Sequence, residues 1–164
     1  MPSAPASKSL DISAIEMSLP EISEQDRTWY ILKGYDITIN QVGIREWYLN
    51  GELHREDGPA VEYADGTREW LLNGKLHRED GPAYERSDGH RVWYLNGKYH
   101  REDGPAIEYA DGTRQWWING KHHREDGPAV ERADGTKEWY LNGIEMSEEE
   151  HRIALNEKMK NATA

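Results

Sequence analysis

The chain has 164 residues, a net charge of −11 and no cysteine. Without cysteine it forms no disulfide bond and has no thiol chemistry. The acidic balance disfavours nucleic acid and anionic membranes as partners, because both attract Lys and Arg. Met1 to Leu10 lack the basic and apolar stretches of a signal peptide, and no segment approaches the ~20 apolar residues that cross a bilayer. We therefore expect a cytoplasmic protein that binds neither nucleic acid nor membranes.

Residues 1–27 form a polar lead-in to the rest of the chain. Four apolar residues recur within it at helical spacing: Ile12, Ile15, Leu19 and Ile22. This spacing predicts a short helix. We expect that helix to cap the N-terminal end of the structure that follows, because a stack of repeats needs a distinct unit at its end.

A period of 23 residues dominates the chain from residue 45 to residue 143. Five tryptophans mark the period: Trp47, Trp70, Trp93, Trp116 and Trp139. Between them the sequence His-Arg-Glu-Asp-Gly-Pro-Ala occurs four times unchanged, beginning at His54, His77, His100 and His123. A fixed period of this size is typical of stacked supersecondary units. We place the array at 28–143, with a degenerate first copy at 29–34, repeats beginning near 45, 68, 91 and 114, and a partial repeat at 137.

One repeat unit is predicted to be a β-hairpin followed by a loop. Residues 60–63 favour a short strand, and residues 64–67 form a tight turn, because their Asp-Gly pair supplies positive φ angles. Residues 68–72 form the return strand, with Trp70 and Leu72 on one face. The Asn-Gly pair at 73–74 predicts a second tight turn, and a bend at Asp-Gly-Pro leads into the next unit.

Residues 144–164 leave the repeat pattern. Ser147 followed by Glu150 is a capping box, in which each side chain bonds the backbone amide of the other residue. We expect a helix of about three turns that covers the unpaired edge of the last strand. The fold class is therefore mainly β: an elongated antiparallel β-meander of tandem 23-residue hairpin repeats, capped by short N- and C-terminal helices.

The repeat resembles a known family. Asn50-Gly51, His54, Gly58 and Ala64-Asp65-Gly66, with their equivalents in later copies, match the MORN repeat (membrane occupation and recognition nexus). The resemblance implies a meandering single-layer sheet that serves mainly as an interaction scaffold. The chain departs from the family by having Arg-Glu-Asp-Gly-Pro-Ala where Gly-x-Gly is usual, so it is MORN-like. Tandem copies of this type also resemble repeats in large bacteriophages and giant viruses, which implies a location in the host cytoplasm.

The four repeated loops hold the first set of candidate partner-binding residues. These are His54, Arg55, Asp57, His77, Arg78, Asp80, His100, Arg101, Asp103, His123, Arg124 and Asp126. In one interpretation the Asp caps the bend and the His or Arg bonds to it, so the motif is structural. In the other, the loops form a ladder that grips a partner. A metal site is disfavoured, because equivalent histidines lie roughly 9–10 Å apart in a sheet with two strands per repeat.

A second set of candidates is a row of glutamates at Glu62, Glu85, Glu108 and Glu131. We predict that this row lies on the face opposite the tryptophans. The residues that follow each tryptophan are expected on the same side as the glutamates: Tyr48, Leu71, Tyr94, Trp117 and Tyr140. An aromatic row beside a carboxylate row would make a protein-binding surface, and a solvated face with no partner is the alternative interpretation.

The sequence favours a non-enzymatic acidic scaffold that binds another protein. No Cys nucleophile and no Gly-rich phosphate loop is present, and the chain repeats one set of groups where a catalytic site needs different groups converging in a pocket. We expect no cofactor. Three alternatives stay open: an inhibitor or decoy that occupies a basic site on a host protein, a structural virion component that self-associates, and a small-ligand or metal binder.

Overall fold

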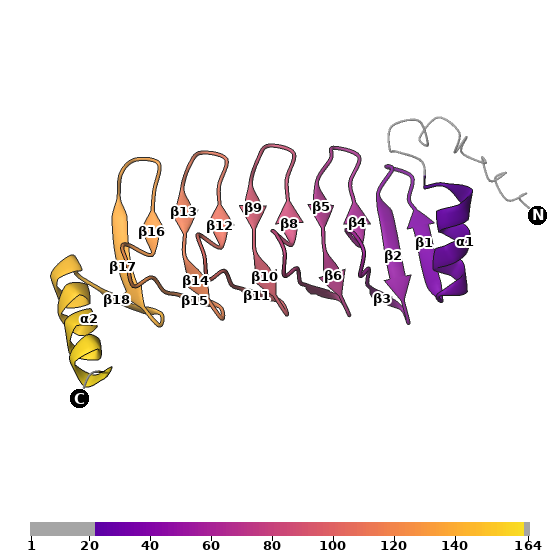
Figure 1. The fold of residues 1–164 in the computed structure, drawn as a ribbon. Coiled ribbons are helices and arrows are strands. Elements are labelled where there is room, and N and C mark those ends of the chain that lie inside the picture. Colours follow the sequence, from indigo (N-terminus) through magenta and orange to yellow (C-terminus); the bar gives the residue numbers. More distant parts are fainter. Residues whose placement is uncertain (1–21, 163–164) are drawn as a thin grey trace, which may run out of the picture.

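The computed structural model describes residues 22–162, which form an elongated antiparallel β-meander with one helix at each end (Figure 1). The predicted fold class is confirmed. The helices are α1 (Glu24–Leu32) and α2 (Glu148–Ala162). The main sheet contains, in spatial order, β1 (Tyr35–Ile39), β2 (Arg45–Leu49), β4 (Val61–Glu62), β5 (Arg68–Glu69), β8 (Tyr84–Glu85), β9 (Arg91–Val92), β12 (Ile107–Glu108), β13 (Arg114–Gln115), β16 (Val130–Glu131), β17 (Lys137–Leu141) and β18 (Ile144–Met146).

A second row of small hairpins runs beside the first, along the lower edge in Figure 1. Its strands are β3 (Glu52–Leu53), which pairs with β2, then β6 (Leu71–Leu72) with β7 (Lys75–Leu76), β10 (Tyr94–Leu95) with β11 (Lys98–Tyr99), and β14 (Trp117–Ile118) with β15 (Lys121–His122). Each central repeat therefore supplies two hairpins, one to the main sheet and one to the lower row.

The two hairpins of a repeat meet at its tryptophan. The return strand predicted at 68–72 is broken at Trp70 into β5 and β6. The Trp70 amide donates to the Ala83 carbonyl at 2.8 Å, and its carbonyl accepts from the His77 amide at 2.9 Å. The backbone thus leaves the main sheet at Trp70 while keeping both of its polar groups bonded.

The two turns of each repeat use different chemistry. Asn73 and Gly74 both have positive φ, 50° and 69°, as a two-residue hairpin turn requires. At the other turn only Gly66 has a positive φ, and the Asp65 carboxylate accepts the Thr67 amide at 2.8 Å. Asp65 therefore stabilises its turn through its side chain and not through the positive φ that its sequence predicts.

The N-terminal end differs from the prediction. The segment assigned as a degenerate repeat at 29–34 lies mostly in α1, so the boundary predicted between residues 27 and 28 falls inside a helix. Ser23 caps this helix by accepting the Asp26 amide at 3.1 Å, and β1 pairs with β2 in place of the predicted copy. The helix predicted from Ile12, Ile15, Leu19 and Ile22 lies almost wholly outside the described residues.

The C-terminal capping box is confirmed. Ser147 Oγ accepts the Glu150 amide at 3.3 Å, and the Glu150 carboxylate accepts the Ser147 amide at 2.7 Å. α2 begins directly after Ser147 and spans 15 residues, so it is longer than the three turns predicted. The buried His151 ring bonds through Nε2 to the Arg124 carbonyl at 2.7 Å, which attaches the helix to the last loop.

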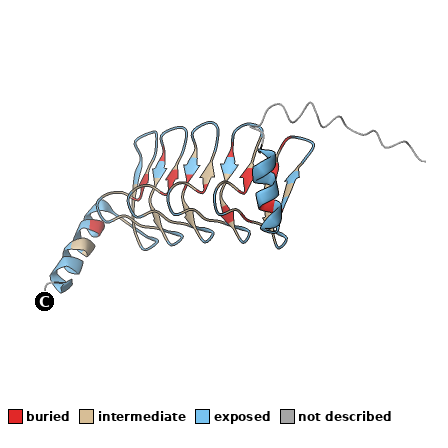
Figure 2. Ribbon diagram, turned by 45° about the vertical axis from the view of Figure 1, so that its right-hand side comes forward, coloured by how far each residue is buried: buried red, intermediate tan, exposed pale blue. Residues whose placement is uncertain are grey.

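The buried side chains lie on both faces of the main sheet. Trp47 is 1% exposed and packs with Tyr30 and Tyr35 at the α1 end, whereas the four tryptophans at the equivalent positions of the later repeats are partly exposed. The opposite face carries a row of buried aliphatic side chains: Val61, Val92, Ile107 and Val130. In the second repeat this row packs against the lower hairpin, where Leu71 contacts Val61 and Ala60. Figure 2 shows that buried positions recur along the whole array.

An aromatic stack runs along the lower row of hairpins at its C-terminal half. The ring centroids of Tyr94 and Tyr99 are 4.7 Å apart, and those of Tyr99 and Trp117 are 5.0 Å apart. His122 continues the stack, at 3.6 Å from Trp117 and 4.8 Å from Tyr140. These residues alternate between the two strands of each hairpin and the next, so the stack joins neighbouring repeats.

Replacing a buried tryptophan and a partly exposed one by alanine tests which part of the array has the more stable core. Trp47→Ala is expected to lower the free energy of unfolding by about 3–5 kcal/mol, because it empties a buried site. Trp93→Ala is expected to cost less, since its ring is already partly hydrated. Chemical denaturation of both variants measures this order, and an equal or larger loss at Trp93 would contradict it.

The stack also predicts an acid-sensitive step in stability. Burial lowers the pKa of His122 below its ordinary value of 6.5; Arg132 acts in the same direction and Glu138 opposes it. Between the folded pKa and about 6.5 the unfolded chain therefore binds more protons than the native state. Stability attributable to His122 is complete above this window and is lost as the pH falls through it.

His122→Tyr restores the residue found at the equivalent Tyr99 and removes the titrating group. Thermal melting from pH 7.5 to 5.5 is expected to show a shallower loss of stability for this variant than for the native chain. His90, whose pKa is also lowered by burial, is retained in both proteins, so the difference between them isolates His122. Parallel melting curves would refute this assignment.

Candidate functional site: grooves between successive loops

The arginine of each repeated loop stacks on the tryptophan of the same repeat. The distances from guanidinium carbon to indole centroid are 4.2 Å for Arg55 on Trp47, 4.1 Å for Arg78 on Trp70, 4.0 Å for Arg101 on Trp93 and 3.8 Å for Arg124 on Trp116. A cation over an aromatic face is attracted by the ring electrons. This contact folds the loop back over the indole that lies eight residues earlier in the chain.

Two further bonds fix the arginine in the loop. Arg101 Nε donates to the Asp103 carboxylate at 2.8 Å, and Nη1 donates to the Pro105 carbonyl at 3.2 Å. The same pair of bonds occurs in each of the other three loops. A Cβ at Gly104 would lie 3.0 Å from the guanidinium carbon of Arg101. The arginine thus explains why Asp and Gly follow it in every copy.

The histidine of each loop bonds to the next repeat. His77 Nδ1 accepts the backbone amide of Asn96 at 3.1 Å, and the same bond joins His54 to Asn73, His100 to Asn119 and His123 to Asn142. In the first two loops Nδ1 also lies close to the side-chain oxygen of the same asparagine, at 2.9 Å between His54 and Asn73 and 3.0 Å between His77 and Asn96. Within the loops, histidine and arginine are therefore occupied in holding the array together.

The glutamate row differs from the prediction. Arg78 lies both on Trp70 and 3.5 Å from the Glu85 carboxylate, so Glu85 is on the tryptophan face and not opposite it. Glu62, Glu108 and Glu131 contact their loop arginines in the same way. The residues after each tryptophan lie on the other face, as Leu71 does in its contact with Val61.

The row is also not purely acidic. Strand register places each of its glutamates between two basic residues of neighbouring strands; Glu85, for example, is opposite Arg68 on one side and Arg91 on the other. The complete row reads Arg45, Glu62, Arg68, Glu85, Arg91, Glu108, Arg114, Glu131 and Lys137. Opposite charges that face each other across strands stabilise the pairing.

The loops nonetheless present carboxylates outward. Glu79 and Asp80 have side chains that are 86% and 83% exposed, whereas Arg78 between them and the sheet is 24% exposed. The third loop repeats this arrangement in Glu102, Asp103 and Arg101. Cations lie inside the loop and anions outside, so negative charge faces the solvent.

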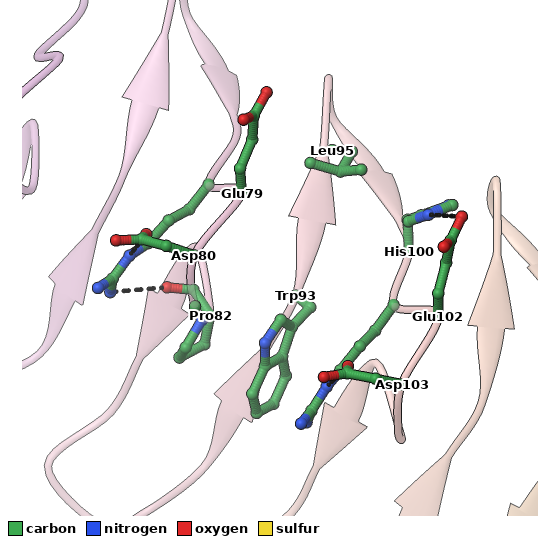
Figure 3. Close-up of a pocket in the computed structure, with 11 residues that line it drawn as sticks. Glu79, Asp80, Pro82, Trp93, Leu95, His100, Glu102 and Asp103 are labelled. Carbon is green, nitrogen blue, oxygen red and sulfur yellow. Dashed lines mark hydrogen bonds and ion pairs between the residues drawn. The ribbon is translucent and has the colours of Figure 1, made fainter.

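Three equivalent grooves lie between successive loops. The central groove has a volume of about 820 Å³, with Trp93 and Leu95 on its floor and residues 78–82 and 100–103 as its walls. Figure 3 shows the Trp93 ring between Pro82 of one loop and Asp103 of the next, with Glu79 and Glu102 on the two walls. The flanking grooves have Trp70 with Leu72 and Trp116 with Ile118 in the corresponding positions, and volumes of about 540 and 700 Å³.

The loop arginines act on the pKa of the aspartates at the rim of the central groove. The hydrogen bond and charge of Arg78 hold the pKa of Asp80 below its ordinary value, and Arg101 does the same for Asp103. At the N-terminal end Tyr30 of α1 donates to Asp57 at 2.7 Å. Burial and this bond raise the pKa of Tyr30 to about 12. The first loop is thus covered by α1, and its Asp57 is less exposed than its equivalents.

The structure accounts for every candidate site residue of the loops. Histidine and arginine face inward, and aspartate is exposed but bonded to arginine. Two features were missed by the sequence reasoning: the exposed glutamates at 56, 79 and 102, and the tryptophan floors of the grooves. The signal for the first was present, because this Glu is the one charged member of the motif that no turn or cap requires.

Among residues 22–162 there is no group of three or more His, Asp or Glu side chains arranged to hold a metal ion. Within the same part of the chain, neither helix combines the length and apolar character needed to span a membrane. The chain matches no protein-family model, and comparisons with curated proteins and with solved structures also gave no match.

The close approach of Arg101 to Gly104 predicts that substitutions at these two positions have non-additive effects on stability. Gly104→Ala is expected to destabilise the array by about 1–3 kcal/mol, because its methyl group displaces Arg101 from Trp93. In an Arg101→Ala background the same change should cost far less, since the obstructing group is gone. A double-mutant cycle by chemical denaturation measures this coupling, and strictly additive losses would show that the arginine does not dictate the glycine.

Proposed function

We propose that the chain is a non-enzymatic MORN-like repeat scaffold that binds another protein through the ridge formed by its four repeated loops. The observation that carries the proposal is the row of three equivalent grooves between these loops. Each has a partly exposed indole on its floor and carboxylates on both walls. Exposed aromatic side chains surrounded by polar groups are typical of protein-binding surfaces.

The arrangement offers little for catalysis. A catalytic site needs unlike groups that converge on one reacting atom, and every groove repeats the same set. The loop histidines accept backbone amides and the loop arginines contact indole, aspartate and carbonyl, so these groups serve the fold. The exposed glutamates and indoles are left to meet a partner.

A second function has support from the charge distribution. Because anions lie outside and cations inside each loop, the ridge would also suit a decoy that occupies a basic site on another protein. The decoy and the scaffold share one surface and differ in the consequence of binding, since a decoy blocks its target while a scaffold leaves the target active.

Site-specific photo-crosslinking tests the ridge as the binding surface. A photoreactive residue replaces Glu79 or Glu102 on the ridge, or Ser87 as a control in the exposed turn between β8 and β9. In cells that produce the protein, the two ridge positions are expected to form an adduct of one defined mass, and the Ser87 position is not.

The adduct is identified by mass spectrometry. Absence of an adduct at both ridge positions, or an equally strong one at Ser87, would contradict binding through the ridge. An adduct with a second copy of the same chain would replace the proposal by self-association, as expected of a structural component.

A further inference from the structure

The ridge repeats one unit of charge and shape at regular intervals. In each unit one arginine lies beneath three carboxylates, for example Arg101 with Glu102, Asp103 and Glu108. That arginine bonds the aspartate and contacts Glu108, so the exposed Glu102 is left without a compensating permanent cation. The fourth loop differs, because its Glu125 forms an ion pair with Lys158 of α2. The surface that remains is an acidic rim around an indole floor.

We propose that this ridge binds an extended basic polypeptide segment in the polyproline II conformation, with Lys or Arg at every third position. The proposal rests on the proposed function and names its partner class. One basic side chain would enter each groove, and three consecutive grooves would hold three such side chains.

The chemistry of a groove matches a long basic side chain. The methylene stem of Lys or Arg packs on apolar surface while its charged head stays at the wet rim. In the central groove Trp93 and Leu95 offer that apolar surface, and the Glu79 and Glu102 carboxylates offer charge on either wall (Figure 3). An acidic or nucleic-acid segment would be repelled by the same carboxylates.

The spacing of the grooves selects the conformation of the segment. Each repeat adds two hydrogen-bonded strands to the main sheet, so neighbouring grooves are about 9.4–9.8 Å apart at the usual strand separation. A polyproline II helix advances ~3.1 Å per residue with three residues per turn, which places every third side chain on one side at ~9.3 Å intervals.

Other regular conformations do not match this interval. Side chains on one face of a β-strand recur every ~6.6–6.8 Å, and one turn of an α-helix advances ~5.4 Å. A segment in either conformation would place its basic residues in register with one groove and out of register with the next. Polyproline II also leaves its backbone polar groups solvated, so it does not need an open sheet edge.

Two peptides of identical composition test the spacing. The first contains about six consecutive Lys-Pro-Pro units. The second contains the same lysines and prolines, with the lysines in adjacent pairs. Fluorescence anisotropy at about 50 mM salt keeps charge interactions measurable. The full chain is expected to bind the evenly spaced peptide at least about fivefold more tightly, because several grooves are engaged at once.

A variant and its matched control test the location. Glu56, Glu79 and Glu102 are changed together to Gln; all three are exposed and line the grooves. In the control, Glu52, Glu148 and Glu157 are changed to Gln, which removes the same charge from exposed positions elsewhere. The first variant is expected to lose the preference for even spacing, and the control to retain it. Circular dichroism checks that both remain folded.

The outcomes separate this inference from the function on which it rests. Equal binding of the two peptides, or equal loss in both variants, would show non-specific attraction to an acidic protein and overturn the inference. If neither peptide binds while the ridge forms its photo-adduct, the partner is not a basic extended segment, yet binding through the ridge stands. Failure of peptides and adduct together would remove both.

Discussion

The contact between a loop arginine and the indole eight residues before it is the interaction on which the rest of the architecture depends. It orders a loop that has no regular secondary structure, and it does so with a cation that aspartate and a proline carbonyl hold in place. An array with short strands and few fully buried large side chains gains from such contacts, because each repeat buries only a thin core. The same contact keeps positive charge inside and leaves negative charge outside.

The repeated loop therefore has two sets of side chains, one directed toward the sheet and one directed toward solvent. The inward groups of the loop make the fold, and the outward carboxylates with the groove floors make a surface. Glu79 and Asp80 have equally exposed side chains, but Asp80 is bonded to Arg78 at 2.8 Å, whereas the contact of Glu79 with His77 is 3.9 Å long. The difference lets a binding surface be altered without disturbing the array.

Much of the fold follows from local sequence signals. The period, the Asn-Gly turns and the box formed by Ser147 and Glu150 are governed by backbone geometry within a few residues, and they were predicted correctly. The segment at 29–34 was misassigned because its likeness to a repeat outweighed a nearby Ser23 cap. The glutamate row was placed on the wrong face, because the pairing of Glu62 with Arg68 depends on the turn between them. The arginine reaches the tryptophan eight residues earlier through a loop without regular secondary structure. Helix or strand periodicity does not predict this contact, so the grooves between the loops were not predicted.

The bond from each loop histidine to the following Asn-Gly turn has a consequence for how such a protein changes in length. Every repeat contains both a loop histidine, which bonds to the next repeat, and an Asn-Gly turn, which receives the histidine of the repeat before it. Duplicating 23 residues in the middle of the array would therefore add one complete repeat and preserve the bonds on either side. Only the final unit needs something different, and there His151 of α2 attaches to the Arg124 carbonyl. The helix ends the array, and the number of 23-residue units ahead of it can change without altering that end.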